Sequence, residues 1–284
     1  MGAIGDAERG VVHHGDNLEI LAGIDDESVD LIYIDPPFNT GKVQRRRTLE
    51  TTHDERGGDR TGFGGRRYRT TELAARAYDD RFEDYAAFLE PRLREAHRVL
   101  KDSGSFYFHI DYREAHGCKL LIDATFGRDN FLNEIIWAYD YGGRPKNRWP
   151  AKHDTIFFSA PRAGRLVCHR DELDRVPYMA PGLVGPEKAA RGKLPTDTWW
   201  HTIVSPTGKE KLGYPSQKPL GVLRRIVCAS CPRDGLVLDF FAGSGTTGAA
   251  ALEEGRRFVL VDDNPEALEV MRRRFEDDEG VRFL

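Results

Sequence analysis

The chain has 284 residues, a formal net charge of -4 and 31% charged residues, values that are ordinary for a globular protein. Its length suits one large α/β domain or one domain that carries an insertion. It contains no apolar run of about 18 residues, and residues 1–9 lack the apolar core of a secretory signal, so we expect a cytoplasmic protein without a membrane partner. The four cysteines include a single CxxC pair, which predicts neither a disulfide framework nor a metal site.

The first part of the chain leads to a stiff corner. We expect a strand over 11–14, a helix over 17–22 with Asp16 as its N-cap, and a second strand over 31–34. That strand runs into Asp35-Pro36-Pro37-Phe38. Proline fixes its own φ and keeps the preceding residue out of the α region, so Asp35 is expected to be extended at a strand end. The corner then offers a carboxylate, a carbonyl and an aromatic ring, which suits an amino group on a planar base. A simple Asp-Pro turn is the alternative interpretation of these four residues.

Residues 39–78 show no clear periodicity and are locally basic. Residues 42–76 hold ten Lys and Arg against five Asp and Glu. A stretch of this length without secondary structure is usually functional or disordered, so we expect a mobile basic loop on the substrate side of the corner. Its candidate phosphate contacts are Arg45, Arg46, Arg47, Arg66 and Arg67. A solvated loop without a ligand is the alternative.

The middle of the chain changes character at Tyr139. Before it we expect a helix over 82–100, a strand over 105–110, a helix to about 126 and a strand near 135–137. After it, residues 140–215 are rich in proline and glycine and are interpreted as an inserted recognition region, within which a strand is expected over 153–158. Arg144, Lys146 and Arg148 are its candidate base or phosphate contacts.

The C-terminal part predicts a βαβ unit with a ligand-binding loop. Helices are expected over 220–229, 246–254 and 265–275, and strands over 236–238 and 258–261, which implies a parallel sheet. Gly243-Ser244-Gly245-Thr246-Thr247-Gly248 follows the first of these strands, and Asp262 ends the second. Such glycines let a ligand approach the backbone at a helix N-terminus, and an acid at the next strand end accepts hydrogen bonds from ribose. The pattern indicates a nucleoside-containing cofactor without singling out NAD.

Three ordered motifs carry a family resemblance. Asp-Pro-Pro-Phe comes first, Tyr214-Pro215-Ser216-Gln217-Lys218-Pro219 follows the recognition region, and Phe241-x-Gly243-x-Gly245 comes last. In this order the chain resembles an S-adenosylmethionine-dependent DNA amino-methyltransferase of the permuted β type. Family members more often have Thr where Ser216 stands and Tyr where Phe38 stands. The resemblance implies a doubly wound, mostly parallel, Rossmann-like α/β sheet with an inserted target-recognition region.

The resemblance also implies a separate role for each of three segments of the chain. Residues 1–139 would be the catalytic part with the mobile loop 39–78, residues 140–215 the recognition region, and residues 216–284 the cofactor-binding part of the same domain. The catalytic residues would be Asp35, Pro36, Pro37 and Phe38. The cofactor-binding residues would be Asp16, Ser216, Gln217, Lys218, Phe241, Gly243, Gly245, Thr246 and Asp262. Helix capping by Asp16 and a surface position for Lys218 are the alternatives.

The expected partners are S-adenosylmethionine and double-stranded DNA, in the setting of restriction and modification, and pairing with a second copy of the chain is left open. Asp-Pro-Pro-Phe favours methylation of adenine N6, and cytosine N4 is the alternative because the chemistry of the two amino groups is the same. An NAD-dependent oxidoreductase is a more distant alternative that rests on the glycine motif alone. A nucleic-acid-binding module without catalysis and an RNA or protein amide substrate also remain open.

Overall fold

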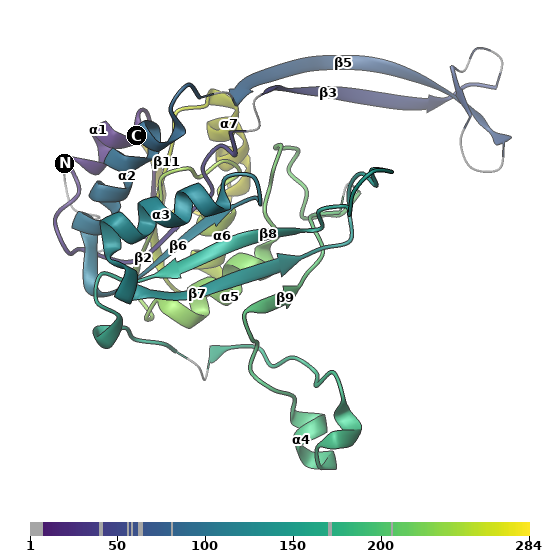
Figure 1. Cartoon of the computed structure of the whole chain (residues 1–284). Helices are drawn as coiled ribbons and strands as arrows, with labels where there is room; N and C mark the ends of the chain where they lie inside the picture. Colours follow the sequence, from purple (N-terminus) through teal and green to yellow (C-terminus); the bar gives the residue numbers. More distant parts are fainter. Residues whose placement is uncertain are drawn as a thin grey trace. The chain divides into compact units, whose positions relative to one another are not determined.

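The computed structural model describes residues 8–39, 42–55, 57, 59–61, 65–80, 82–169, 172–205 and 207–284. It divides into two compact units, Met1–Pro36 with Ala86–Leu284, and Pro37–Tyr85. The first unit is built on a sheet with the strand order β12-β1-β11-β10-β2-β6-β8-β7-β9 (Figure 1). Its strands are β1 (Gly10–His14), β2 (Val29–Ile34), β6 (Leu100–Ile110), β7 (Phe131–Ala138), β8 (His153–Ser159), β9 (Thr198–Trp200), β10 (Leu236–Asp239), β11 (Arg257–Asp262) and β12 (Val281–Phe283).

The strands from β12 to β6 are parallel to one another, β8 runs antiparallel to β6 and β7, and β9 is parallel to β7. The prediction of a doubly wound, mostly parallel sheet is therefore confirmed. β2 and β10 are direct neighbours, with Leu31 opposite Val237 and Ile32 opposite Leu238. Their carboxyl ends, and the two motifs that follow them, consequently lie at the same edge of the sheet.

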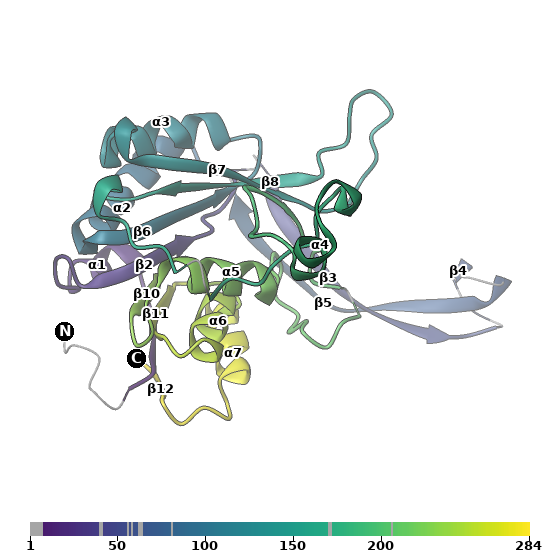
Figure 2. The same ribbon diagram turned by 90° about the horizontal axis from the view of Figure 1, so that it is seen from below.

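Helices cover both faces of this sheet (Figure 2). One face carries α1 (Asn17–Leu21), α2 (Tyr85–Val99) and α3 (Ala115–Phe126); the other carries α5 (Leu220–Ser230), α6 (Thr246–Glu253) and α7 (Pro265–Arg274). The helices form where apolar residues recur at helical spacing, as in α2, where Leu89, Leu93 and Ala96 are all fully buried. Parallel strands covered on both faces are apolar throughout, which explains the continuous runs in β2, β10 and β11. No described helix is long and apolar enough to cross a membrane.

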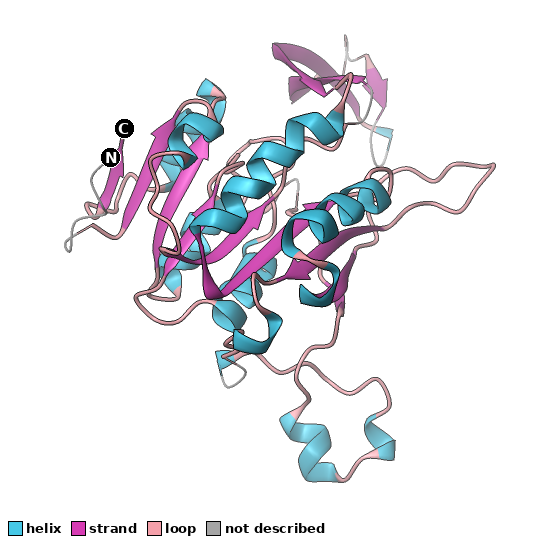
Figure 3. Cartoon of the chain, turned by 60° about the vertical axis from the view of Figure 1, so that its left-hand side comes forward, coloured by secondary structure: helices cyan, strands magenta, loops and turns pink. Residues whose placement is uncertain are grey.

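The region predicted to recognise the target contributes to the sheet as well as to the surface. β8 and β9 both come from residues 140–215 and pair with β7. Between them, a short 3-10 turn (Pro181–Leu183) and α4 (Pro186–Arg191) project from the sheet on loop segments (Figure 3). Met179 and Leu183 of this excursion are almost completely exposed. The recognition role of residues 140–215 stays a prediction.

The second unit contains a long antiparallel hairpin where the sequence predicted a loop without secondary structure. β3 (Lys42–His53) pairs with β5 (Arg67–Asp80) from Lys42–Asp80 to His53–Tyr68, and β4 (Arg60–Thr61) pairs with the start of β5 (Figure 1). The prediction of an irregular loop over 39–78 was wrong. A hairpin is held by backbone pairing between neighbouring segments, so it needs no apolar alternation to mark it in the sequence.

Candidate active site

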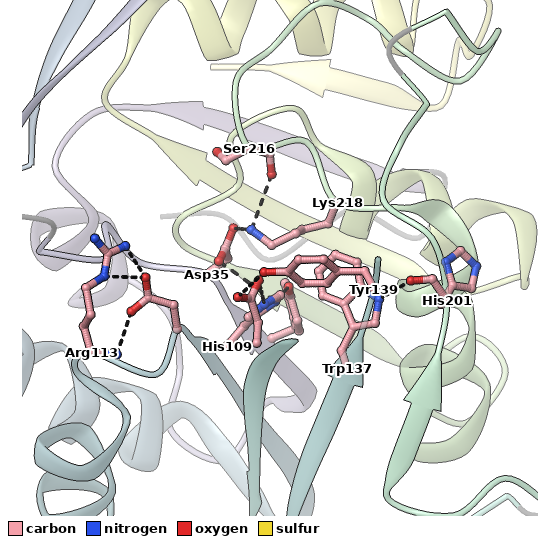
Figure 4. Close-up of polar contacts among 11 residues, drawn as sticks. Asp35, His109, Arg113, Trp137, Tyr139, His201, Ser216 and Lys218 are labelled. Atoms are coloured by element: carbon pink, nitrogen blue, oxygen red, sulfur yellow. Dashed lines mark hydrogen bonds and ion pairs between the residues drawn. The ribbon is translucent and has the colours of Figure 1, made fainter. Parts of the chain in front are cut away.

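Asp35 follows β2 at the carboxyl edge of the sheet, and its two carboxylate oxygens have different surroundings (Figure 4). Oδ2 accepts a hydrogen bond from the Lys218 ammonium in a close ion pair. Oδ1 is buried and accepts no hydrogen bond from any described residue. The Nδ1 atom of His109 lies 4.0 Å from it. One oxygen is therefore anchored, and the other is a desolvated acceptor that a donor could satisfy.

Lys218 reaches Asp35 from the turn that precedes α5. Its side chain is buried, and its ammonium also donates to the Ser216 carbonyl at 3.4 Å. Ser216 has a φ of 56°, in the left-handed region, which folds the turn back toward the site. Gln217 holds the base of the same segment, because its Nε2 donates to the Glu210 carbonyl at 2.7 Å and its Oε1 accepts from the Leu212 amide at 3.0 Å. The ion pair with Asp35 was not predicted; contacts of Ser216, Gln217 and Lys218 with the cofactor stay predictions.

A buried polar network that sequence reasoning missed lies beside Asp35 (Figure 4). His109, near the end of β6, is fully buried; its Nε2 lies 3.2 Å from Asp154 Oδ2, and its Nδ1 lies 2.7 Å from the Tyr33 hydroxyl. The Tyr139 hydroxyl donates to the other oxygen of Asp154 at 3.0 Å. Because β8 is antiparallel, Asp154 at its start meets the carboxyl ends of the parallel strands. The signal for His109 was a polar residue at a strand end, within Phe106-Tyr107-Phe108-His109.

The electrostatics of this network favour an ionised Asp154. Burial by itself would raise the pKa of the Asp154 carboxyl, but the hydrogen bond and charge of His109, the charge of Lys218 and the Tyr139 hydroxyl lower that pKa below its usual value. Burial, together with the Asp154 charge, raises the pKa of Tyr139. Tyr139 is therefore a neutral hydroxyl donor at physiological pH. The ring of Trp137 packs edge-on against the His109 ring, with 5.5 Å between the ring centroids.

The glycine motif forms a tight loop between β10 and α6. Gly243 and Gly245 have φ values of 51° and 72°, which side chains disfavour, and a Cβ on Gly245 would lie 2.8 Å from Met271 Cγ. The Gly243 amide donates to Asp262 Oδ2 at 2.7 Å, and the Asn264 amide donates to Oδ1 of the same residue at 2.9 Å. Asp262 thus ties the glycine loop to the start of α7. A bond from its remaining lone pairs to ribose stays a prediction.

Asp239, the last residue of β10, leads into this loop and was missed by the sequence reasoning. Its Oδ2 accepts from the Thr247 hydroxyl at 2.6 Å, and its Oδ1 accepts from the Phe241 amide at 3.0 Å. Burial, with the charges of Asp35 and Asp262 in addition, raises the pKa of the Asp239 carboxyl to about 7. Burial likewise raises the pKa of Asp262 to about 6. Three carboxylates therefore converge on the edge that carries both motifs.

The other predicted cofactor residues border the same edge. Asp16 is the N-cap of α1, because its Oδ1 accepts from the Leu18 and Glu19 amides at 2.8 and 3.3 Å. Its capping role is thereby confirmed, and a contact with the cofactor stays a prediction. The Phe241 ring lies 6.1 Å from the ring of Phe88. Thr246 begins α6.

The remaining predicted residues belong to the loop between β7 and β8 and to the second unit. Arg144, Lys146 and Arg148 are exposed in the loop between β7 and β8, and Arg144 lies 3.6 Å from Asp140. Pro37, Phe38, Arg66 and Arg67 belong to the second unit, where both arginines are exposed. Arg45, Arg46 and Arg47 lie in β3, with side chains outside the described part of the chain. Their roles in DNA binding and base stacking stay predictions. Over the described ranges, no group of three or more His, Cys, Asp or Glu side chains has metal-binding geometry.

Comparison with known proteins shows that this chain is similar in sequence to DNA methyltransferases. The chain is 29% identical over 282 residues to the DNA adenine methyltransferase YhdJ of Escherichia coli, covering 95% of this chain and 83% of that protein. It is 26% identical to the type II methyltransferase M.HpaI of Haemophilus parainfluenzae, covering 92% and 72% of the two chains.

Solved structures share the fold. The PvuII DNA methyltransferase, which is cytosine-N4-specific, superposes with a TM-score of 0.64 at 17% identity, over 98% of this chain and 92% of that one. The complex of M1.HpyAVI with S-adenosylmethionine gives 0.58 at 18% identity, over 94% and 98%. A family model described as DNA methylase matches residues 29–273, so the chain belongs to the N6 and N4 DNA methyltransferase family that its motifs resemble.

Proposed function

We propose that this protein methylates the N6 amino group of adenine in double-stranded DNA at a specific site. Family membership makes it a DNA methyltransferase acting on an exocyclic amino group. The choice of adenine is supported by Asp-Pro-Pro-Phe at 35–38 and by the adenine methyltransferase among its relatives. The observation that carries the proposal is the buried Asp35 Oδ1, an acceptor with no hydrogen-bond partner among the described residues. An amino group that enters this corner would supply the missing donor.

S-adenosylmethionine is the methyl donor of the family, and it supplies an electrophilic methyl group on a positively charged sulfur. The residues at the sheet edge fit such a group. The carboxylates of Asp35 and Asp262 are near enough for their charges to add to the effect of burial in raising the pKa of Asp239. A negative edge favours a sulfonium and disfavours the pyrophosphate of NAD, which argues against the oxidoreductase alternative. The left-handed conformations of Gly243 and Gly245 form the tight loop before α6, and a helix N-terminus of this kind suits a nucleoside-containing cofactor.

The chain's contribution to the reaction is to orient and polarise the target amino group. Asp35 Oδ1 accepts one N–H of that group, and the Pro36 carbonyl, which follows directly, accepts the second. Both bonds draw the nitrogen lone pair out of conjugation with the ring, so that it becomes a nucleophile. Lys218 and the neighbouring buried groups hold the carboxylate while this happens. Catalysis in this scheme comes mainly from positioning.

The target base has to leave the duplex, because its amino group is engaged in pairing. Extrusion costs a few kcal/mol, and stacking on an aromatic ring such as Phe38 returns about 1–3 kcal/mol. The exposed cations at Arg144, Lys146 and Arg148 are suited to phosphate or base contacts that fix the duplex beside the site.

The test of the catalytic assignment uses Asp35→Ala together with Asp35→Asn, which preserves the shape of the side chain. We expect both variants to lose methylation of DNA while they still bind S-adenosylmethionine, as measured by transfer of a labelled methyl group and by isothermal titration. Near-normal turnover by either variant would refute the assignment. Digestion of the methylated DNA to nucleosides, followed by mass spectrometry, distinguishes N6-methyladenine from N4-methylcytosine; the second product would replace adenine with cytosine in the proposal.

A further inference from the structure

The Asp35 carboxylate has an orientation that no property of the residue itself fixes. The torsion that rotates a carboxylate is broad and roughly two-fold, so an isolated Asp exchanges its oxygens readily. In this protein, Oδ2 is bound by Lys218 and Oδ1 is left without a hydrogen-bond partner among the described residues. The ammonium of Lys218 is therefore the contact that selects which oxygen remains open.

Lys218 is itself held in place by the segment that carries it. Its ammonium donates to the Ser216 carbonyl, and the left-handed conformation of Ser216 sets the direction of the turn. Gln217 is bonded through both ends of its amide to the loop at 210–212. Pro219 then occupies the N-cap position of α5, and α5 packs against β2 of the sheet. The lysine is thus presented by a rigid turn, whereas an exposed lysine loses several rotamers when it binds a ligand.

The charge of Lys218 also matches its surroundings. The ammonium is buried, and it faces the Asp35 carboxylate directly and contributes to lowering the pKa of Asp154. A buried cation between two carboxylates compensates their repulsion, and a buried carboxylate that loses such a partner is strongly disfavoured. These contacts are already satisfied by residues of the chain itself.

We propose that Lys218 is a positioning residue for the methyl-transfer step: it anchors Asp35 through Oδ2 so that Oδ1 faces the target amino group, and it acts on the rate of the reaction rather than on cofactor affinity. This inference rests on the proposed function, since it concerns the same carboxylate. It departs from the role that the family resemblance implies, in which Lys218 binds the cofactor. The two roles predict opposite changes in rate and binding.

The test compares Lys218→Met, which removes the charge but keeps the length, with Lys218→Arg, which restores a cation. We expect Lys218→Met to lower the single-turnover rate of DNA methylation at saturating S-adenosylmethionine by at least about tenfold. The dissociation constant for S-adenosylmethionine, measured by isothermal titration, should stay within about twofold of the wild type. Lys218→Arg should recover part of the lost rate, because it can still donate to Asp35 Oδ2.

Lys101→Met is the matched control. Lys101, in β6, donates to Asp30 at 2.8 Å and so makes another Lys–Asp pair with the β2 segment, but Asp30 lies near the start of β2, away from the carboxyl edge. This control should keep the wild-type rate. The inference would be overturned if Lys218→Met reached the normal rate at saturating cofactor while its dissociation constant rose tenfold or more. It would also be overturned if Lys218→Arg, folded by circular dichroism, were as slow as Lys218→Met. Absence of DNA methylation by the wild type would instead refute the proposed function.

Discussion

Asp239 makes the stability of this protein depend on pH in a direction opposite to that of most carboxylates. Its pKa is about 7 in the folded protein, because of burial and the charges of Asp35 and Asp262, against an ordinary value of 3.8. A raised pKa in the folded state stabilises the protein fully below the unfolded-state pKa, and this contribution is lost as the pH rises through 7. Between pH 5.5 and 8.5 the unfolded chain keeps Asp239 ionised while the folded chain loses its proton, which removes about 2 kcal/mol of stability.

The variant Asp239→Asn isolates this contribution, since its side chain does not titrate. Asn offers one acceptor where Asp239 accepts from both the Thr247 hydroxyl and the Phe241 amide, so at pH 5.5 the variant should be less stable than the wild type by about 1 kcal/mol. At pH 8.5 this difference should vanish or reverse, because the wild type alone has lost about 2 kcal/mol.

Urea denaturation of both proteins at the two pH values, followed by tryptophan fluorescence, measures the change. Glu269→Gln on the exposed face of α7 controls for the loss of one acidic group. A difference between wild type and Asp239→Asn that stays constant within about 0.5 kcal/mol across this range would refute the assignment of a buried, protonated Asp239.

Three other predictions concern the ion pair, the glycine loop and the hairpin. Asp35→Ala leaves the Lys218 ammonium buried without its carboxylate, so the free energy of unfolding should fall by about 3 kcal/mol. A second change, Lys218→Met, should restore most of that stability. Equal urea midpoints for Asp35→Ala and the wild type would contradict this prediction. Gly245→Ala should cost about 1–3 kcal/mol of stability because of its left-handed φ, whereas Gly117→Ala in α3 has open space and should cost nothing; thermal denaturation separates them. Alanine at 45–47 should weaken binding to DNA of any sequence and flatten its salt dependence, and an unchanged slope in titrations at several salt concentrations would exclude this stretch from the interface.

Much of the central architecture could be predicted because its signals are local. Apolar runs marked β2, β10 and β11, helical spacing marked α2 and α5, and the rule for parallel strands placed both motifs at one edge. The same rule predicts that polar residues at strand ends gather there. It covers Asp35 and Asp262, and it would have extended to His109 and Asp239 had it been applied to every strand.

The parts that escaped prediction depend on long-range pairing. Asp154 reaches the site because β8 runs antiparallel between β6 and β7, and neither its direction nor its register is written in residues 153–159. Lys218 meets Asp35 across 183 positions of the chain, and that contact appears only when α5 packs beside β2. The hairpin at 42–80 lacks the apolar alternation by which half-buried strands are usually detected.

The loop between β7 and β8 belongs to the predicted recognition region, and the way its ends are held decides which changes it can accommodate. Both of its ends are fastened, since the Tyr139 amide donates to the Lys152 carbonyl at 2.9 Å and strand pairing resumes at Ala138–His153. Residues 140–151 can therefore vary in length and composition without moving Tyr139 or Asp154. A single residue inserted inside β8, by contrast, would turn Asp154 to the other face of the sheet. If this loop is exchanged for that of a relative, the two joining points therefore lie where strand pairing already fixes the backbone.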